Sequence, residues 1–245
     1  MNTYAYTRFE LLRTFRSKRF FVMSLGFPLV IYLLIALPNR GVSDFAGTGI
    51  SAPLYYMVGL AAFGAMAAIL SSGTRIAGER AVGWNRQLRI TPLTTRAYLR
   101  TKVLTGYLMA LLTVGLLYLA GSALGVRLPA ADWLHMTLLM IVALIPLAAL
   151  GILLGHLLTV DSMGPALGGT TSLFAILGGA WGPLASGGFL GAAVKWVPSY
   201  WLVKAGQTVV GGGAWPAQAW IVIGLWTAVS IRLAVRVYGR DTQRV

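Results

Sequence analysis

The sequence predicts an all-α integral membrane protein with six transmembrane helices, and three observations lead to this prediction. The chain of 245 residues is 57% hydrophobic but only 11% charged, whereas a typical soluble domain is roughly 25% charged. Six stretches of 20 to 33 residues contain no Asp, Glu, Lys or Arg. Each can cross a bilayer as a helix, which takes about 20 apolar residues and satisfies its own backbone hydrogen bonds in lipid. These stretches are Phe20–Asn39, Phe45–Thr74, Val103–Val126, Trp133–Val160, Ser162–Val194 and Ala205–Ile231.

The chain reads as one transmembrane domain over residues 1–245. Residues 1–19 are partly amphipathic at helical spacing, and they predict an N-terminal interfacial helix on the membrane surface. The stretch Ser162–Val194 is too long for one span and is Gly-rich after Pro183. We therefore expect a helix there, followed by a broken or re-entrant outer region before the last span. The expected spans are about 20–38, 52–73, 103–125, 134–158, 165–184 and 216–237.

Two prolines predict local features of these spans. Pro28 stands in the middle of the first span, where a missing backbone N–H predicts a kink. Pro165 stands where it would open the fifth span, a position that tolerates a missing N–H.

Basic residues predict which side of the membrane each segment occupies. The segments on the side of the two termini carry 16 Lys and Arg residues, whereas the opposite side carries 4, namely Arg40, Arg127, Lys195 and Lys204. Such a bias in short loops marks the cytoplasmic side. We therefore expect a multi-pass protein of the cell (cytoplasmic) membrane with both termini in the cytoplasm. The net charge of +14 then reflects topology and anionic lipid, and we expect no nucleic-acid partner.

Composition also excludes several kinds of chemistry. The chain has no cysteine, which removes disulfides, Cys-ligated metals and a Cys nucleophile. The dipeptide Gly-Lys does not occur, so the chain has no P-loop for ATP. The charge-free stretches hold no buried acid of the kind that proton- or sodium-coupled carriers use. We expect a non-enzyme that itself binds no cofactor and no metal.

The longest polar segment, Arg75–Lys102, carries the most informative pattern. Gly83 and Pro92 punctuate it, and a short helix can end before the proline. Trp84 and Leu88 are four residues apart, so they would share one face of that helix. A surface helix of this kind can dock into a groove on a soluble partner.

This segment resembles the loop between the second and third spans of ABC-2 type transporter permeases, and the short outer loops and modest length of the chain look more like those of drug or antibiotic exporters than of polysaccharide exporters. In those proteins an acid–base pair is followed by a Gly, a Leu and a Thr-Pro step. The matching residues here, in order, are Glu79, Arg80, Gly83, Leu88, Thr91 and Pro92. The family's acidic residue between the Gly and the Leu is absent, because Trp84-Asn85-Arg86-Gln87 fills that interval. The resemblance extends over the whole chain through the six-span plan, the basic first helix and the Pro-aromatic step at Trp196–Trp201.

The resemblance implies a permease subunit of an ATP-driven ABC exporter. Such a permease forms a homodimer or pairs with a paralogue, and cytoplasmic P-loop ATPase subunits bind ATP and Mg below it. The substrate would be hydrophobic or amphipathic, such as a drug, an antibiotic or a lipid-like molecule. A coupling helix would transmit closure of the ATPase to the spans, and the residues assigned to it are Glu79, Arg80, Gly83, Trp84, Leu88 and Pro92.

Polar and aromatic residues within the spans are candidates for the substrate pathway. The same residues could serve as interhelical hydrogen bonds and interfacial anchors, and the sequence does not separate these roles. An ion-coupled carrier, an intramembrane enzyme and a non-transporting scaffold stay open as alternatives. The candidate pathway residues are Tyr55, Tyr56, Thr170, Thr171, Ser172 and Trp181.

Overall fold

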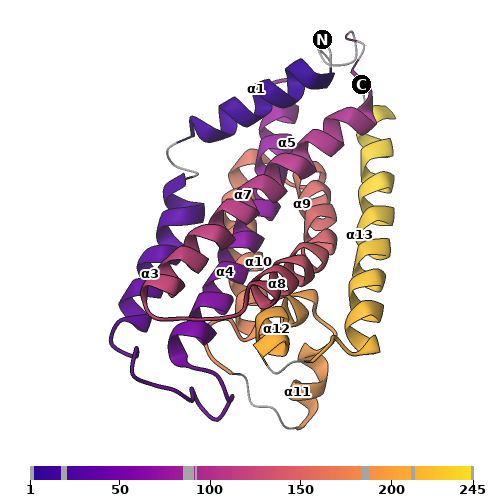
Figure 1. The fold of residues 1–245 in the computed structure, drawn as a ribbon. Helices are drawn as coiled ribbons and strands as arrows, with labels where there is room; N and C mark the ends of the chain where they lie inside the picture. The colour runs from indigo at the N-terminus through magenta and orange to yellow at the C-terminus, as the bar shows by residue number, and fades with distance from the viewer. Residues whose placement is uncertain are drawn as a thin grey trace.

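The structure is a computed structural model that describes residues 3–17, 21–84, 91, 93–183, 188–210 and 213–243. Within these ranges every regular element is helical (Figure 1). In chain order the elements are α1 (Thr3–Phe15), the π-helical turn η1 (Val22–Gly26), α3 (Phe27–Ala36), α4 (Ala52–Leu70), α5 (Ser72–Ala81), α7 (Thr95–Ala123), α8 (Ala130–Ala143), α9 (Ile145–Leu157), α10 (Val160–Gly178), α11 (Gly188–Val194), α12 (Pro198–Val210) and α13 (Ala217–Gln243).

In the described part of the chain, four helical stretches are long and apolar enough to cross a membrane. They correspond to the predicted second, third, fourth and sixth spans, and they are Ala52–Ala81, Thr95–Ala123, Ala130–Leu157 and Ala217–Tyr238. The predicted first span contains a shorter apolar helix, Ser24–Ala36. The predicted fifth span corresponds to α10, whose 19 residues include Asp161 and several Gly, Ser and Thr. The complete six-span topology stays a prediction.

Helix α4 forms the centre of the bundle. Its side chains are apolar on every face, as expected of a helix that is surrounded by others. Met57, Leu60 and Met66 are fully buried, and α4 packs against α3, α7, α9, α10 and α12. The remaining helices are therefore arranged around α4.

The two ends of the bundle differ in what they carry (Figure 1). Helix α1, α5 and the C-terminal part of α13 lie at one end. The segment after α3 and the short helices α11 and α12 lie at the opposite end. Both short helices fall in the interval where the sequence predicted a broken region.

The fifth predicted span begins and ends earlier than the sequence suggested. Thr159 and Ser162 form a reciprocal capping box, which starts α10 at Val160 because it satisfies free N–H groups of the first turn. Pro165 consequently lies inside α10 rather than at its start, and the prediction that it opens the helix was wrong. The helix ends at Gly178 because Gly179 adopts a left-handed conformation, with φ of 75°.

The region around Pro28 shows how the first apolar segment accommodates a proline. Pro28 has no N–H to donate to the carbonyl of Ser24, four residues earlier. A π-helical turn, Val22–Gly26, precedes it. The hydroxyl of Thr113 in α7 donates to the Ser24 carbonyl oxygen at 3.4 Å. The π-helical turn thus lies directly before the proline at which the sequence predicted a kink. The same Thr113 hydroxyl lies closer to the Met109 carbonyl, at 2.9 Å, so its single proton is shared between the two acceptors.

Candidate functional site

The Arg75–Lys102 segment begins as a direct continuation of α4 rather than as a separate surface helix. Helix α5 extends α4 beyond Ser71 and ends at Ala81. Gly83 then adopts a left-handed conformation with φ of 68°, which is a conformation that only glycine adopts without strain. Glu79 therefore belongs to α5, and its side chain is only 3% exposed. It faces the protein interior rather than a surface that a partner could touch.

Glu79 belongs to a group of five charged side chains that we call the ion cluster, made of Glu10, Arg13, Arg75, Glu79 and Lys102. The Nζ atom of Lys102 lies 2.7 Å from Oε1 of Glu10 and 2.5 Å from Oε1 of Glu79. Arg13 lies 3.1 Å from Glu79, and Arg75 lies 3.3 Å from Glu10. Because these residues come from α1, α5 and α7, the ion cluster joins three helices that are far apart in sequence.

Hydroxyl groups and aromatic rings complete the surroundings of the ion cluster. The Tyr98 hydroxyl donates to Oε2 of Glu79 at 2.6 Å. Arg75 donates to the hydroxyl of Thr14, which itself donates to the carbonyl of Glu10 at 2.7 Å. The Lys102 ammonium also lies 5.2 Å from the ring centroid of Tyr98, within the range of a cation–π contact.

Burial and charge act in opposite directions on Glu10. Burial of the carboxyl group raises its pKa, whereas Lys102 and Arg75 lower it, and the net effect holds the pKa of Glu10 below its usual value. Glu10 is therefore ionised at neutral pH. A buried ion pair is stable only while it is complete, because removing one partner leaves an uncompensated charge away from water.

The α5–α9 crossing holds the ion cluster against the rest of the bundle. A Cβ atom on Gly73 would collide with the carbonyl oxygen of Gly151, so the two backbones touch. Nη1 of Arg80 donates to the carbonyls of Gly155 at 3.1 Å and Leu158 at 3.5 Å. These carbonyls lie at the C-terminal end of α9, where intrahelical partners are missing. Arg80 therefore caps α9.

Of the remaining predicted coupling residues, the structure describes Trp84. Trp84 is half-buried and packs against the small apolar cluster formed by Tyr6, Ile76 and Tyr98. Leu88 and Pro92 lie outside the described residues. Helix α7 begins after Thr94, whose side chain accepts a hydrogen bond from the Ala97 N–H at 3.3 Å and so caps the helix.

The predicted pathway residues do not converge on one site. Thr171 is buried, Thr170 is half-buried and Ser172 is exposed, so these three neighbours lie on different faces of α10. Trp181 packs edge-on against Phe63, with ring centroids 5.3 Å apart.

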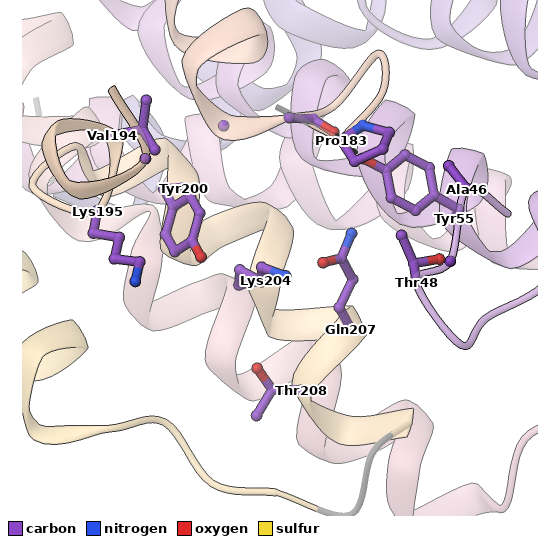
Figure 2. Close-up of a pocket in the computed structure, with 14 residues that line it drawn as sticks. Ala46, Thr48, Tyr55, Pro183, Val194, Lys195, Tyr200, Lys204, Gln207 and Thr208 are labelled. Carbon is purple, nitrogen blue, oxygen red and sulfur yellow. Dashed lines mark hydrogen bonds between the residues drawn. The ribbon is translucent and has the colours of Figure 1, made fainter. Parts of the chain in front are cut away.

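The two tyrosines near the start of α4 lie at the end of the bundle opposite α1. Tyr55 donates a hydrogen bond to the carbonyl of Gly179 at 2.7 Å, which ties α4 to the end of α10. The Tyr55 and Tyr56 rings both pack against Phe45. Of the predicted pathway residues, Tyr55 lines a described cavity of about 540 Å³ (Figure 2).

Most of the ion cluster was not predicted from the sequence. The sequence placed Arg75 and Lys102 in a polar loop and Glu10 and Arg13 in the N-terminal interfacial helix, and it did not show that these four side chains meet. The available signal was compositional: the chain has only two glutamates, Glu10 and Glu79, and both lie in the ion cluster. No group of three His, Asp or Glu side chains among the described residues is placed to hold a metal ion.

Comparison with known proteins supports a transport role. The chain is 26% identical, over 209 residues, to "Putative transport permease YvfS" of Bacillus subtilis (strain 168). The aligned region covers 84% of this chain and 84% of that protein. No family profile and no solved structure matches the chain. The protein is therefore similar over most of its length to a transport permease, and it carries apolar helices that fit a multi-pass membrane protein.

Proposed function

We propose that this chain is the membrane-spanning subunit of an ATP-driven exporter of the ABC-2 type, and that a separate P-loop ATPase binds at the end of the bundle where α1 and α5 lie. Similarity to a transport permease supports the transport role. The resemblance of the Glu79–Pro92 pattern to the ABC-2 type transporter permeases supports the ABC-2 assignment. The chain's lack of a P-loop requires that ATP bind elsewhere.

The observation that carries this proposal is the connection of both stems of the predicted coupling loop through the ion cluster. Glu79 lies two residues before the end of α5, and Lys102 lies in the second turn of α7. Their ion pair closes the base of the loop, and Glu10 adds α1 to it. Separating these helices would take the buried charges of the ion cluster away from their partners, which is unfavourable as long as they stay away from water. A push on the loop therefore moves α1, α5 and α7 together.

We assign three roles to the predicted coupling residues. Glu79 and Arg80 face the interior and transmit motion, Glu79 to α1 and α7 and Arg80 to α9. Gly83 provides the left-handed turn from which the loop departs. Trp84, Leu88 and Pro92 belong to the loop itself, and we propose that the ATPase contacts this part.

An ion-coupled carrier is the second candidate, and the buried glutamates are the observation that favours it. A carrier of that kind needs a carboxylate that takes up and releases a proton during its cycle. Lys102 and Arg75 hold the pKa of Glu10 below its ordinary value, so protonation of this residue is unfavourable at neutral pH. The ion cluster therefore suits a permanent structural connection better than a proton relay.

Apolar surface on α10 and α13 supports pairing with a second permease in the membrane. Leu173 and Ile176 of α10 are 53% exposed, and Ile221 and Leu225 of α13 are 59% and 51% exposed. Lipid or a second permease subunit, identical or paralogous, would cover these side chains. We propose that the pair moves a hydrophobic or amphipathic substrate outward across the cell membrane, with both termini of each chain in the cytoplasm.

Co-purification from native membranes tests the proposed function. The tagged chain is solubilised in mild detergent and captured, and the co-purifying proteins are identified and quantified against an untagged control. We expect a P-loop ATPase in stoichiometric amount. A stable complex that lacks any ATPase would contradict the exporter and favour the carrier or a scaffold.

A further inference from the structure

A cavity at the end of the bundle opposite the ion cluster has a lining that the proposed function does not explain. It has a volume of about 540 Å³ and lies between the 46–48 segment, the end of α10, α11 and α12 (Figure 2). We call it the α12 pocket. Its position is on the side that the charge bias predicts to be extracytoplasmic.

One face of α12 supplies most of the polar lining. Tyr200, Lys204, Gln207 and Thr208 line the pocket at positions i, i+4, i+7 and i+8, a spacing that places side chains on the same side of a helix. Lys195 lines the pocket from the turn after α11. Figure 2 shows the side chains of Lys204 and Gln207 next to one another on α12.

The two lysines form a concentration of positive charge that nothing described in the structure neutralises. No carboxylate lines the described pocket, and no described Asp or Glu lies within ion-pair distance of either ammonium. The described acid closest in sequence to a lining residue is Asp44, two residues before Ala46, and its carboxylate accepts a hydrogen bond from the Gly49 backbone N–H at 2.8 Å. Lys204 instead lies 5.9 Å from the ring centroid of Tyr200.

The two ammonium groups also act on each other. Burial lowers the pKa of Lys204, and the positive charge of Lys195 lowers it further. Both effects oppose protonation of Lys204 in the empty pocket. An anion between the two lysines would offset the effect of Lys195 on the pKa of Lys204, because it attracts both ammonium groups.

Membrane topology makes this pair unusual. The side predicted to be extracytoplasmic carries only four basic residues, and two of them line this one pocket. The rule that sets membrane orientation disfavours basic residues in short extracytoplasmic loops. The pair is therefore better explained by a ligand than by topology.

We propose that the α12 pocket binds a phosphate-type anionic group, with Lys195 and Lys204 as its cationic partners and Gln207 and Thr208 as neutral hydrogen-bond donors. Two lysine charges match a doubly ionised phosphate, and charge-assisted hydrogen bonds of this kind are the strong ones. The group belongs to the exported substrate, a step that rests on the proposed function. The substrate class is then an amphiphile with an anionic head, which the pocket receives before release.

Calorimetric titration of the purified full-length chain, in phosphatidylcholine nanodiscs, tests this site. The probes are inorganic phosphate, dodecyl phosphate and the uncharged detergent dodecyl maltoside. After subtraction of the heat measured on protein-free nanodiscs, which removes partition into the bilayer, we expect heat from a phosphate-bearing probe but not from dodecyl maltoside. Tighter binding of dodecyl phosphate than of inorganic phosphate identifies an amphiphile as the source of the group, whereas equal affinity identifies the free anion as the source and removes the amphiphilic substrate class.

Variants assign the binding to the pocket. Lys195→Met and Lys204→Met should each weaken phosphate binding about tenfold, because each removes one charged partner. Lys204→Arg should retain most of the affinity. Arg127→Met is the matched control, since it removes a basic residue predicted on the same side but outside the pocket lining, and it should bind as the wild type does. Lys195 is exposed, so its replacement should not disturb folding. If Lys204→Met does not fold, Lys195→Met alone still tests the site.

The outcomes separate this proposal from the proposed function. Absence of phosphate-dependent heat, or unchanged affinity in both lysine variants, would overturn the anion site and leave the exporter intact. Lysine-dependent binding by a protein that has no ATPase partner would keep the site and remove the exporter.

Discussion

Lys102 and Glu79 stand 23 residues apart in the chain, yet the Lys102 ammonium lies 2.5 Å from the Glu79 carboxylate. Their ion pair bridges the two helices from which the predicted coupling loop departs. Side-chain exposure is 0% for Lys102 and 3% for Glu79, so water does not weaken the pair by screening. The contact joins α5 to α7, and our proposal uses it to carry motion from the segment between them to both helices.

Replacing Lys102 by Met should strongly destabilise the protein. The change leaves Glu10 and Glu79 without their shared cation, and breaking a buried pair costs about 3–5 kcal/mol. Thermal unfolding in detergent, followed by fluorescence-detected size exclusion, measures the effect. Arg100→Met is the matched control, because Arg100 is exposed on the same helix. Equal melting temperatures for the two variants would show that the ion cluster does not hold the helices together.

Removing the Tyr98 hydroxyl should weaken the same connection by a smaller amount. Tyr98→Phe deletes the donor to Glu79, and a hydrogen bond to a charged group contributes about 1.5–3 kcal/mol. Tyr107→Phe provides a comparison on the same helix, because its hydroxyl donates to the neutral carbonyl of Ile141 at 3.0 Å. We expect the larger loss of thermal stability for Tyr98→Phe, and the opposite order would argue against a charged Glu79.

Attachment of α1 should depend on pH through Glu10. Lys102 and Arg75 overcome the effect of burial and lower the pKa of Glu10 below its ordinary value of 4.5. The stabilisation that ionised Glu10 provides is therefore fully present above about pH 4.5. It is lost as the pH falls through the lowered pKa of Glu10 in the folded protein. The chain has no cysteine, so Leu12→Cys and Leu104→Cys, both at exposed positions, allow a spin-label distance between α1 and α7.

The control for this titration is Glu10→Gln in the same labelled background. The distribution of spin-label distances in the wild-type protein should broaden only in acid. In the Glu10→Gln protein the distribution should show no pH dependence that arises from position 10. An acid transition of the same midpoint in both proteins would assign the effect to a different residue.

Replacing Gly83 by Ala should uncouple the loop without unfolding the bundle. The left-handed φ of 68° is strained for any side chain, at about 1–2 kcal/mol, although a Cβ there meets no described atom. Gly78→Ala adds the same methyl group in α5, where φ is helical and a Cβ likewise meets nothing. With the reconstituted ATPase complex, we expect less transport per ATP for Gly83→Ala and unchanged coupling for Gly78→Ala. Equal coupling in both would remove Gly83 from the mechanism.

The sequence predicted the membrane helices better than their ends. Long charge-free stretches mark α4, α7 and α13 because apolar length is a local property. The start of α7 lies eight residues before the predicted span at Val103, because Thr94 caps the helix and polar residues such as Lys102 are buried by α1. Burial of this kind depends on which helices meet, and one sequence does not show that.

The candidate site was predicted in part for the same reason. The spacing of Glu79, Arg80 and Gly83 singled out the Arg75–Lys102 segment, which supplies three residues of the ion cluster. It did not show that Glu79 faces Lys102 and Glu10 rather than a partner, because that contact joins three helices. The pathway residues were selected by type alone, and the structure distributes Thr170, Thr171 and Ser172 over different faces of α10.

Contact between an ATPase and the loop after α5 is the step on which the proposed exporter depends, and site-specific photo-cross-linking detects it. A benzophenone amino acid replaces Val82, which is 75% exposed beside the loop, and in a second protein it replaces Leu134, which is 62% exposed near the start of α8. After irradiation of native membranes, we expect a cross-link from position 82 to a P-loop ATPase and none from position 134. A cross-link to the ATPase from position 134, or none from position 82, would contradict the proposed contact.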